Sequence, residues 1–266
     1  MNGQIRILGC GSSAGVPRVG IGWGNCDPAN PRNRRRRCSL LVERSGPEGI
    51  TQALVDTSPD LRMQLLSADV QHLDGVFVTH AHADHVHGID DVRPLIQKMR
   101  RRIDIHMDRP TAETVLLRFD YIFRTPPGSQ YPPLLNHRHI EDGRPCVVDG
   151  AGGPIEAIPF RLQHGDIDAL GFRFGAVAYT PDVVDIPAVS QDYLADLDLW
   201  IIDALQYRKH ASHFSYAEAL EWIARMNPKR AVLTNLSTDL DYETMKSELP
   251  PNVEPAFDGM KLALDL

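Results

Sequence analysis

Short runs of hydrophobic residues, separated by polar and glycine-rich segments, follow one another along most of this chain. Residues 4–8 alternate polar and apolar side chains and lead into a glycine-rich turn at residues 9–13, the pattern of a half-buried β-strand. Eight further runs rich in Val, Ile and Leu predict strands. These runs are residues 39–42, 52–56, 75–79, 102–107, 155–160, 170–179, 199–203 and 230–234.

Helices are fewer, and three of them have recognisable start signals. Ser215 with Glu218 three residues later forms a capping box that predicts a helix over residues 216–226. Ser58 before a proline opens a second helix, and a third is expected after Pro110. Because strand clusters are separated by helices without strict one-to-one alternation, we expect an α/β protein with mixed sheets and helices on their outer faces.

Length and composition change this picture little. The 266 residues are 42% hydrophobic and 24% charged, which is enough for one large domain over residues 1–266. The proline-rich residues 125–133 and the segment 150–154 are therefore expected to be loops within that domain. No apolar run approaches the length of a membrane span, and the first residues lack the apolar segment of a secretory signal. We expect a cytoplasmic protein that does not enter a membrane.

Charge and cysteine content exclude some function classes. The net charge of −7 offers no overall attraction to nucleic acid, which makes a nucleic-acid partner unlikely on electrostatic grounds. The four cysteines stand singly, without the spacing of a structural zinc site or a redox pair, and are expected to be reduced thiols.

Histidines and aspartates cluster directly after one predicted strand. Residues 75–79 are followed by His80, His82, Asp84 and His85, four potential metal ligands within six residues. On extended backbone, residues i and i+2 point to the same side, so His80 and His82 can bind one ion together. Asp84 and His85 can turn toward a second ion as the chain bends. Ordinary hydrogen-bonded histidines rarely produce this density, so the cluster predicts a metal site.

Two further candidates follow strands later in the chain. His164 comes after the strand predicted over residues 155–160, and Asp182 follows the strand predicted over residues 170–179. Alone, each is more often a loop histidine or a turn aspartate. In company with the earlier cluster, both become candidate ligands.

This HxHxDH sequence, followed by a lone histidine and then an aspartate, resembles the metallo-β-lactamase superfamily of hydrolases. The resemblance implies an αββα four-layer sandwich. Within the superfamily the chain looks most like the cyclic-phosphate phosphodiesterase family of the carbon–phosphorus lyase pathway, itself similar to tRNA 3′-processing endonucleases. The finer resemblance rests on residues 8–18, 56–62, 210–213 and 258–260.

The resemblance also implies a pattern of metal ligands. This sequence departs from the family at two places. His80, His82 and His164 correspond to the ligands of one metal, Asp84 and His85 to those of the other, with Asp182 bridging. Residues 21–27 hold one thiol where some relatives bind a structural zinc, so none is expected here. Residues 234–239 contain no histidine where the superfamily usually supplies the last ligand. The second of two divalent ions, Zn²⁺ or Mn²⁺, is therefore expected to bind more weakly, and Ser237→His is the first substitution expected to tighten it.

The expected chemistry is phosphodiester hydrolysis. Two divalent ions about 3.5–4 Å apart activate water and neutralise charge on the attacking and leaving oxygens. Asp84 is expected to orient the nucleophile, and His213 resembles the family's histidine that gives a proton to the leaving group. His210 is a weaker candidate for that role, and either histidine could instead cap the neighbouring turn.

Other conspicuous residues have plainer interpretations. The arginines of the run 32–37 could collect phosphate oxygens, but such a run is more often a solvated face. Trp23, Phe214 and Tyr216 could stack on a base, but single aromatics more often belong to the core or its rim.

Three functions remain open at this point. The first is a binuclear metal-dependent phosphodiesterase that acts on a small cyclic phosphate or a nucleotide, through a metal-bound hydroxide. The second is a tRNA 3′-processing type of endoribonuclease, and the third a non-catalytic metal- or nucleotide-binding protein. A small phosphate ester or nucleotide is the expected partner, and a homodimer is left open.

Overall fold

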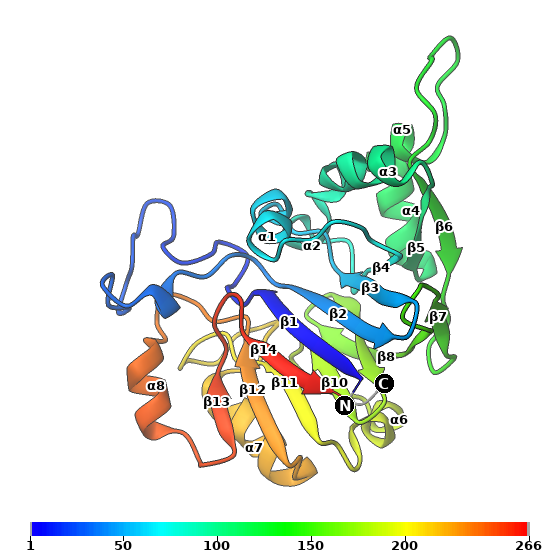
Figure 1. Cartoon of the computed structure of the whole chain (residues 1–266). Helices are drawn as coiled ribbons and strands as arrows, with labels where there is room; N and C mark the ends of the chain where they lie inside the picture. Colours follow the sequence, from blue (N-terminus) through cyan, green and yellow to red (C-terminus); the bar gives the residue numbers. More distant parts are fainter. Residues whose placement is uncertain (1, 265–266) are drawn as a thin grey trace.

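Two β-sheets of seven strands each form the centre of the computed structural model, which describes residues 2–264 (Figure 1). Strands β1 to β3 of the first sheet pair antiparallel, whereas β3 to β6 run parallel. In spatial order its strands are β14 (Lys261–Leu264), β1 (Gly3–Gly9), β2 (Ser39–Gly46), β3 (Gly49–Val55), β4 (Gly75–Phe77), β5 (Ile103–Met107) and β6 (Leu135–His139).

The second sheet repeats this division into a parallel and an antiparallel part. Strands β10 to β13 run parallel, and β7 to β10 pair antiparallel. In spatial order its strands are β13 (Val253–Pro255), β12 (Arg230–Thr234), β11 (Leu199–Asp203), β10 (Val177–Thr180), β9 (Ile167–Phe174), β8 (Ile155–His164) and β7 (Cys146–Val148).

Helices cover the outer face of each sheet (Figure 1). The first sheet carries α1 (Leu61–Ser67), α2 (Ala83–Val86), α3 (Arg93–Met99), α4 (Arg109–Arg118) and α5 (Asp120–Phe123). The second carries α6 (Ala188–Gln191), α7 (Tyr216–Met226) and α8 (Tyr242–Glu248). Short 3₁₀ turns lie at η1 (Pro31–Asn33), η2 (Ile89–Val92) and η3 (Asp192–Leu194).

Buried apolar side chains from both sheets meet in a shared inner core. The rings of Phe77 in β4 and Phe172 in β9 lie 5.4 Å apart between centroids, and Phe174 lies 6.0 Å from Phe77. Two further apolar layers lie between each sheet and its own helices. The predicted αββα sandwich is confirmed, because each sheet buries both of its faces.

Local sequence signals explain several elements well. Ser215 and Glu218 form the predicted capping box, and α7 begins and ends where the pattern placed it. The helix predicted from Ser58 begins later, at Leu61, because the Ser58 hydroxyl accepts from Asp60 N and donates to Gln64 instead of capping.

The strand predicted over residues 170–179 is wrong as a single element. The chain reverses at Gly175, whose φ of +55° lies in the left-handed region, so β9 and β10 form a hairpin. The loops predicted over residues 125–133 and 150–154 contain no helix or strand. The four cysteines are free thiols, as predicted. The prediction of one domain over residues 1–266 stays a prediction.

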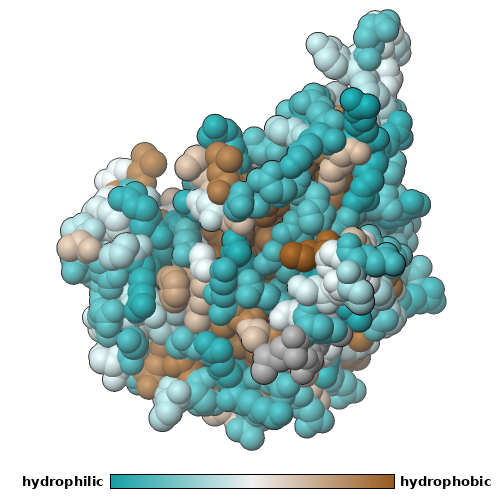
Figure 2. Space-filling view, viewed as in Figure 1, coloured by the Kyte–Doolittle hydropathy of each residue, from teal (hydrophilic) through white to brown (hydrophobic). Residues whose placement is uncertain are grey.

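The surface in Figure 2 is mainly hydrophilic, with hydrophobic residues in scattered patches. Within residues 2–264, none of the helices combines the length and hydrophobicity needed to cross a lipid bilayer.

Candidate metal centre

The candidate residues meet at one edge of the sandwich, where strands of both sheets end. In the first sheet, the loop after β4 carries His80 and His82, and the short helix α2 that follows carries Asp84 and His85. In the second sheet, β8 ends at His164 and β10 is followed by Asp182. A backbone hydrogen bond from Leu170 N to Thr79 O, 2.9 Å, joins the two sheets beside His80. Residues far apart in sequence are thereby fixed around one point.

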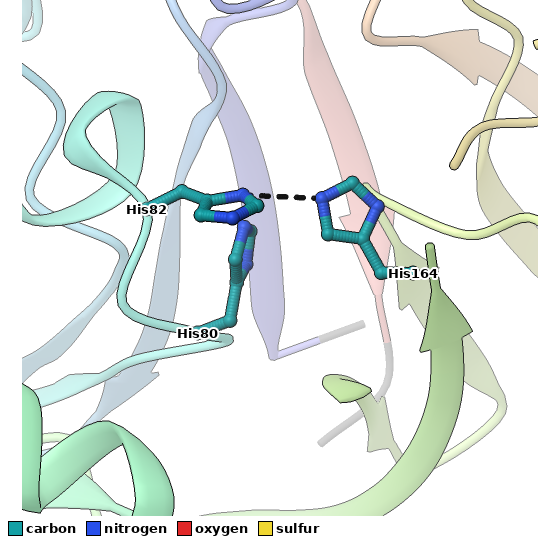
Figure 3. Close-up of side chains that lie close together, drawn as sticks. All are labelled: His80, His82 and His164. Carbon is teal, nitrogen blue, oxygen red and sulfur yellow. Dashed lines mark hydrogen bonds between the residues drawn. The ribbon is translucent and has the colours of Figure 1, made fainter. Parts of the chain in front are cut away.

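His80, His82 and His164, here called the three-histidine set, face one another across the two sheets (Figure 3). Their ring centroids lie 4.6 to 5.0 Å apart, and His164 Nε2 lies 3.2 Å from His82 Nδ1. One nitrogen of each ring falls within 4.8 Å of the others, so a single cation could contact all three.

Neighbouring oxygen atoms fix the orientation of two of these rings. His164 Nδ1 donates to Ser212 O at 2.7 Å, and His80 Nδ1 lies 3.0 Å from the Thr79 hydroxyl. Each Nε2 is thereby left to point inward, as in metal sites whose outer partners set the tautomer. His80 Nε2 is buried without a hydrogen-bond partner among the described residues. Burial lowers the pKa of His80 well below its usual value, which keeps its lone pair available.

Asp84, His85 and Asp182, here called the carboxylate set, lie beside the first set. His85 Nε2 is 3.3 Å from Asp182 Oδ1 and 3.4 Å from Asp84 Oδ2. Burial acts to lower the pKa of His85, but the carboxylates of Asp182, Asp56 and Asp84 outweigh it and raise that pKa well above its usual value. Three carboxylates around one imidazole form a site that attracts positive charge.

Asp182 stands between the two sets. Its Oδ2 lies 3.5 Å from His164 Nε2 and 3.9 Å from His80 Nε2, while its Oδ1 faces His85. Burial acts to raise the pKa of Asp182, but His85 and the other histidines hold it well below the usual range. The side chain is 4% exposed. A buried carboxylate with one oxygen directed toward the three-histidine set and the other toward His85 has the geometry of a bridging ligand.

Two buried aspartates that sequence reasoning did not assign support the site. Asp56, after β3, accepts from His85 Nδ1 at 2.7 Å, and from Thr79 N at 2.8 Å. Asp203, the last residue of β11, accepts from His213 Nδ1 at 2.8 Å. One sequence signal could have identified both residues, because each is an acidic residue at the end of a buried apolar strand. Burying a carboxylate there costs free energy unless the carboxylate has a partner.

His213 enters the site from the loop before α7. Its Nε2 lies 3.9 Å from Asp182 Oδ2, and its ring centroid is 4.7 Å from that of His164. Burial acts to lower the pKa of His213, but Asp203 raises it to about 9. His210 is exposed and bonds within its own loop through Ser212. Of the two histidines considered, only His213 reaches the centre.

Asn235 occupies the position after β12 where a last histidine was expected and not found. Its Nδ2 donates to Pro181 O at 3.0 Å and lies 3.4 Å from Asp182 Oδ1. Ser237, the first position considered for a restored histidine, directs its carbonyl to Arg35 at 3.0 Å. Asn235 therefore contacts the carboxylate set directly, through Asp182.

The arginine run has a structural role. Arg35 is 2% exposed and donates to Leu240 O at 2.7 Å, so the interpretation of the run as a solvated face is wrong at this residue. Arg34 lies over Trp23, with 5.1 Å between guanidinium carbon and ring centroid. Phe214 and Tyr216 are buried in the outer core of the second sheet. None of these aromatic side chains lines the metal centre.

The donor set fits divalent cations. Five of the six residues predicted as ligands fall into three compact trios of donor atoms, whereas Asp84 contacts the group through His85. His213 joins the third trio with His164 and Asp182. Imidazole and carboxylate donors together suit Zn²⁺ or Mn²⁺. The unpartnered Nε2 of His80 is the buried polar atom that such an ion would satisfy.

Similarity to known proteins extends over nearly the whole chain. A crystal structure of a diphosphatase from the PhnP family superposes with a TM-score of 0.88 at 30% sequence identity, covering 99% of this chain and 98% of that one. A ribonuclease Z from Bradyrhizobium diazoefficiens is 25% identical over 86% of this chain and 94% of its own length.

A third relative is longer. An octanoyltransferase from Porphyromonas gingivalis is 33% identical over 97% of this chain, but the chain spans only about half of that protein, 51% of its length. The model of the beta-lactamase superfamily domain matches residues 51–234, which include both donor sets. The chain therefore belongs to the beta-lactamase superfamily and has the metallo-β-lactamase fold, a fold that implies bound divalent metal.

Proposed function

We propose that the protein is a binuclear metal-dependent phosphodiesterase that acts on a small cyclic phosphate or nucleotide. The observation that carries the proposal is the position of Asp182, whose two oxygens face two adjacent donor sets. A pair of divalent ions, when bound, supplies activated water and neutralises the phosphate charge. His80, His82 and His164 would hold one ion and Asp84 and His85 the other, with Asp182 shared.

The chain's own residues supply the remaining steps. Asp84 is only partly buried and accepts a hydrogen bond from the attacking water, which orients it toward phosphorus. His213 stands beside Asp182 with Nε2 facing the centre and Nδ1 held by Asp203. Because Asp203 raises its pKa to about 9, His213 is protonated at neutral pH and gives the Nε2 proton to the departing alkoxide oxygen.

Hydrolysis of bis(p-nitrophenyl) phosphate by protein loaded with Mn²⁺ or Zn²⁺ tests the proposal. A phosphodiesterase releases nitrophenol in proportion to the metal loaded, and EDTA abolishes the release. Metal binding without any turnover would instead identify a non-catalytic binding protein and overturn the proposal.

An endoribonuclease acting on tRNA is the second candidate, because a ribonuclease Z is among the relatives. The net charge of −7 opposes it, since binding to nucleic acid depends on neutralising many phosphates. Cleavage of precursor tRNA, with a steep loss of binding between 50 and 200 mM salt, would favour this candidate over a small ester.

A further inference from the structure

A cavity of about 350 Å³ lies on the first sheet, away from the metal centre. Its walls are α3, residues 100–102 before β5 and residues 131–134 before β6. Strands β4, β5 and β6 run parallel, and the metal ligands of this sheet follow the end of β4. About 17 Å, the length of the five-residue β5, separates the strand starts at the cavity from the edge that carries these ligands. A ligand in this cavity would therefore leave the metal centre free.

Four arginines line the cavity, and its lining includes neither Asp nor Glu. The arginines are Arg93, Arg100, Arg101 and Arg102. Two of them have carboxylate partners that lie outside the lining, since Arg93 is paired with Asp90 and Arg101 with Asp74. The charges of these two guanidiniums are therefore partly neutralised.

The other two arginines have no carboxylate partner among the described residues. Within residues 2–264, Arg100 forms no hydrogen bond or ion pair, and Arg102 contacts Asn136 Oδ1 at 3.4 Å. Asp104, which lines a neighbouring cavity together with Arg102, is already bonded to Arg138 at 2.8 Å. Guanidinium groups bind phosphate oxygens through two parallel hydrogen bonds. In a chain of net charge −7, these two side chains form a local site for an anion.

A second wall of the cavity is apolar and aromatic. It consists of Tyr131, Pro132, Pro133 and Leu134. These residues belong to the segment between α5 and β6, which stands away from the body of the protein (Figure 1). The Thr125 hydroxyl donates to Tyr131 O at 3.0 Å, and Leu134 N donates to Ile122 O at 2.7 Å, so both ends of the wall are held in place. Tyr131 is 75% exposed, and its ring offers a surface on which a flat base can stack.

We infer that this cavity binds a free nucleotide, with its phosphates on Arg100 and Arg102 and its base against Tyr131. A lone phosphate would leave the apolar wall in water, and an uncharged ring would leave the two guanidiniums without a partner. The volume of about 350 Å³ lies near the lower end of the roughly 300–1,000 Å³ typical of small-molecule sites, which suits one nucleotide. The inference does not rest on the proposed function, because the cavity shares no residue with the two donor sets.

Calorimetric titration of the Zn²⁺-loaded protein with ADP tests the inference. Arg100→Gln should weaken ADP binding at least about tenfold, because it removes a charge-assisted contact to phosphate. Lys98→Gln is the matched control, since it removes the same charge from an exposed residue of α3 outside the lining. It should leave the affinity within about twofold of wild type, because salt screens a charge outside the cavity. Equal affinities of the two variants, or no binding of ADP to the wild-type protein, would overturn the inference.

Tyr131→Ala tests the position of the base. Loss of stacking should weaken ADP binding at least about fivefold. The affinity for ribose 5-phosphate, which has no base, should stay at the wild-type value. An unchanged affinity for ADP would overturn the inference, because the aromatic wall would then have no part in binding.

The His82→Ala variant separates this cavity from the metal centre. ADP binding that survives in His82→Ala and is lost in Arg100→Gln supports the cavity. ADP binding that is lost in His82→Ala and survives in Arg100→Gln would locate the nucleotide at the metal centre. That result would overturn the inference and leave the proposed phosphodiesterase activity standing.

A single-stranded RNA of about five nucleotides tests the alternative occupant, since its bases and phosphates have the same chemistry. Binding of this RNA less than about tenfold tighter than that of ADP supports a site for one free nucleotide. RNA binding that is tighter than this, and that Arg100→Gln weakens, would overturn the inference in favour of a nucleic-acid surface.

Discussion

The two halves of the metal centre are built differently. In the three-histidine set, imidazoles from both sheets converge, and oxygen atoms at Thr79 and Ser212 fix two of the rings. In the carboxylate set, His85 lies between two aspartates of the set, its Nδ1 bonds to Asp56 outside it, and Asn235 stands where a last histidine was expected. Fixed nitrogen donors favour tight binding of zinc-like ions, whereas oxygen donors favour harder and more exchangeable ions. The comparison predicts one retained ion and one exchangeable ion.

The largest expected effect follows from removing a ring of the three-histidine set. His82→Ala should lose the retained ion. It should also reduce hydrolysis by well over the roughly 10–100-fold loss that is typical when a residue that only supports a metal ligand is changed. Elemental analysis after dialysis measures the ion, with His137→Ala, on β6 and away from the centre, as control. Unchanged metal content would remove the basis for assigning this set.

His213→Ala tests whether this side chain acts as a proton donor or belongs to the metal ligands. Loss of a positioned general acid should slow esters with alkoxide leaving groups by about 10²–10⁴-fold. Nitrophenyl esters should be affected far less, because nitrophenolate needs no proton. Metal content should stay at the wild-type value. An equal loss on both kinds of ester, accompanied by loss of an ion, would instead make His213 a ligand.

Asp56→Asn should affect mainly the carboxylate half, because Asp56 contacts His85 directly and reaches His80 only through the Thr79 hydroxyl. Asp56 accepts from His85 Nδ1, and weakening such an outer partner typically costs 10–100-fold in metal affinity. Titration with Mn²⁺ should show the weaker site weakened further, while the retained ion stays bound. Loss of both ions together would show that the two halves are not separable.

Asn235→His should reduce the difference between the halves. The substitution places an imidazole where the amide now lies 3.4 Å from Asp182 Oδ1. The second ion should then resist dialysis, with an affinity gain of tenfold or more. Two tightly retained ions in the unaltered protein would contradict the premise, because the carboxylate set would already be complete.

The smallest expected effect is a shift in the pH profile. Asp203 raises the pKa of His213 to about 9, so the protonated acid is present below that pH and is lost as pH rises through it. Asp203→Asn removes the carboxylate charge and should move the alkaline limb of kcat/KM to lower pH by about one unit or more. The difference between the profiles of the two metal-loaded proteins is the measurement. Coincident limbs would mean that His213 is not the titrating acid.

Sequence patterns located the strands that position the site more reliably than the strands at the sheet edges. The strands β11 and β12 lie where the apolar runs predicted them, because buried parallel strands are continuous hydrophobic runs. Among the strands not predicted, β6 has the sequence LNHRH and β7 has only three residues. Such edge strands form through pairing with a neighbour, which no local pattern records.

Within the site, the residues that are contiguous in sequence were the easiest to predict, whereas His164, Asp182 and His213 became candidates only beside that cluster or through the family resemblance. The residues from His80 to His85 form one cluster along the chain, and the structure places them together. Asp56 reaches His85 across 29 residues, and Asp203 reaches His213 across 10. These pairs depend on the geometry of the sheet edges, so their roles could not be read from the residues alone.

One backbone feature recurs in both sheets. Asp56, after β3, has φ of +63°, and Asn235, after β12, has φ of +61°. Among residues other than glycine, Asn, Asp and His are enriched in this left-handed conformation. The codons for asparagine and histidine differ by one base, so a single nucleotide change at position 235 can exchange amide for imidazole with little backbone cost. Metal stoichiometry in this lineage can therefore evolve without refolding the strand that presents the ligand.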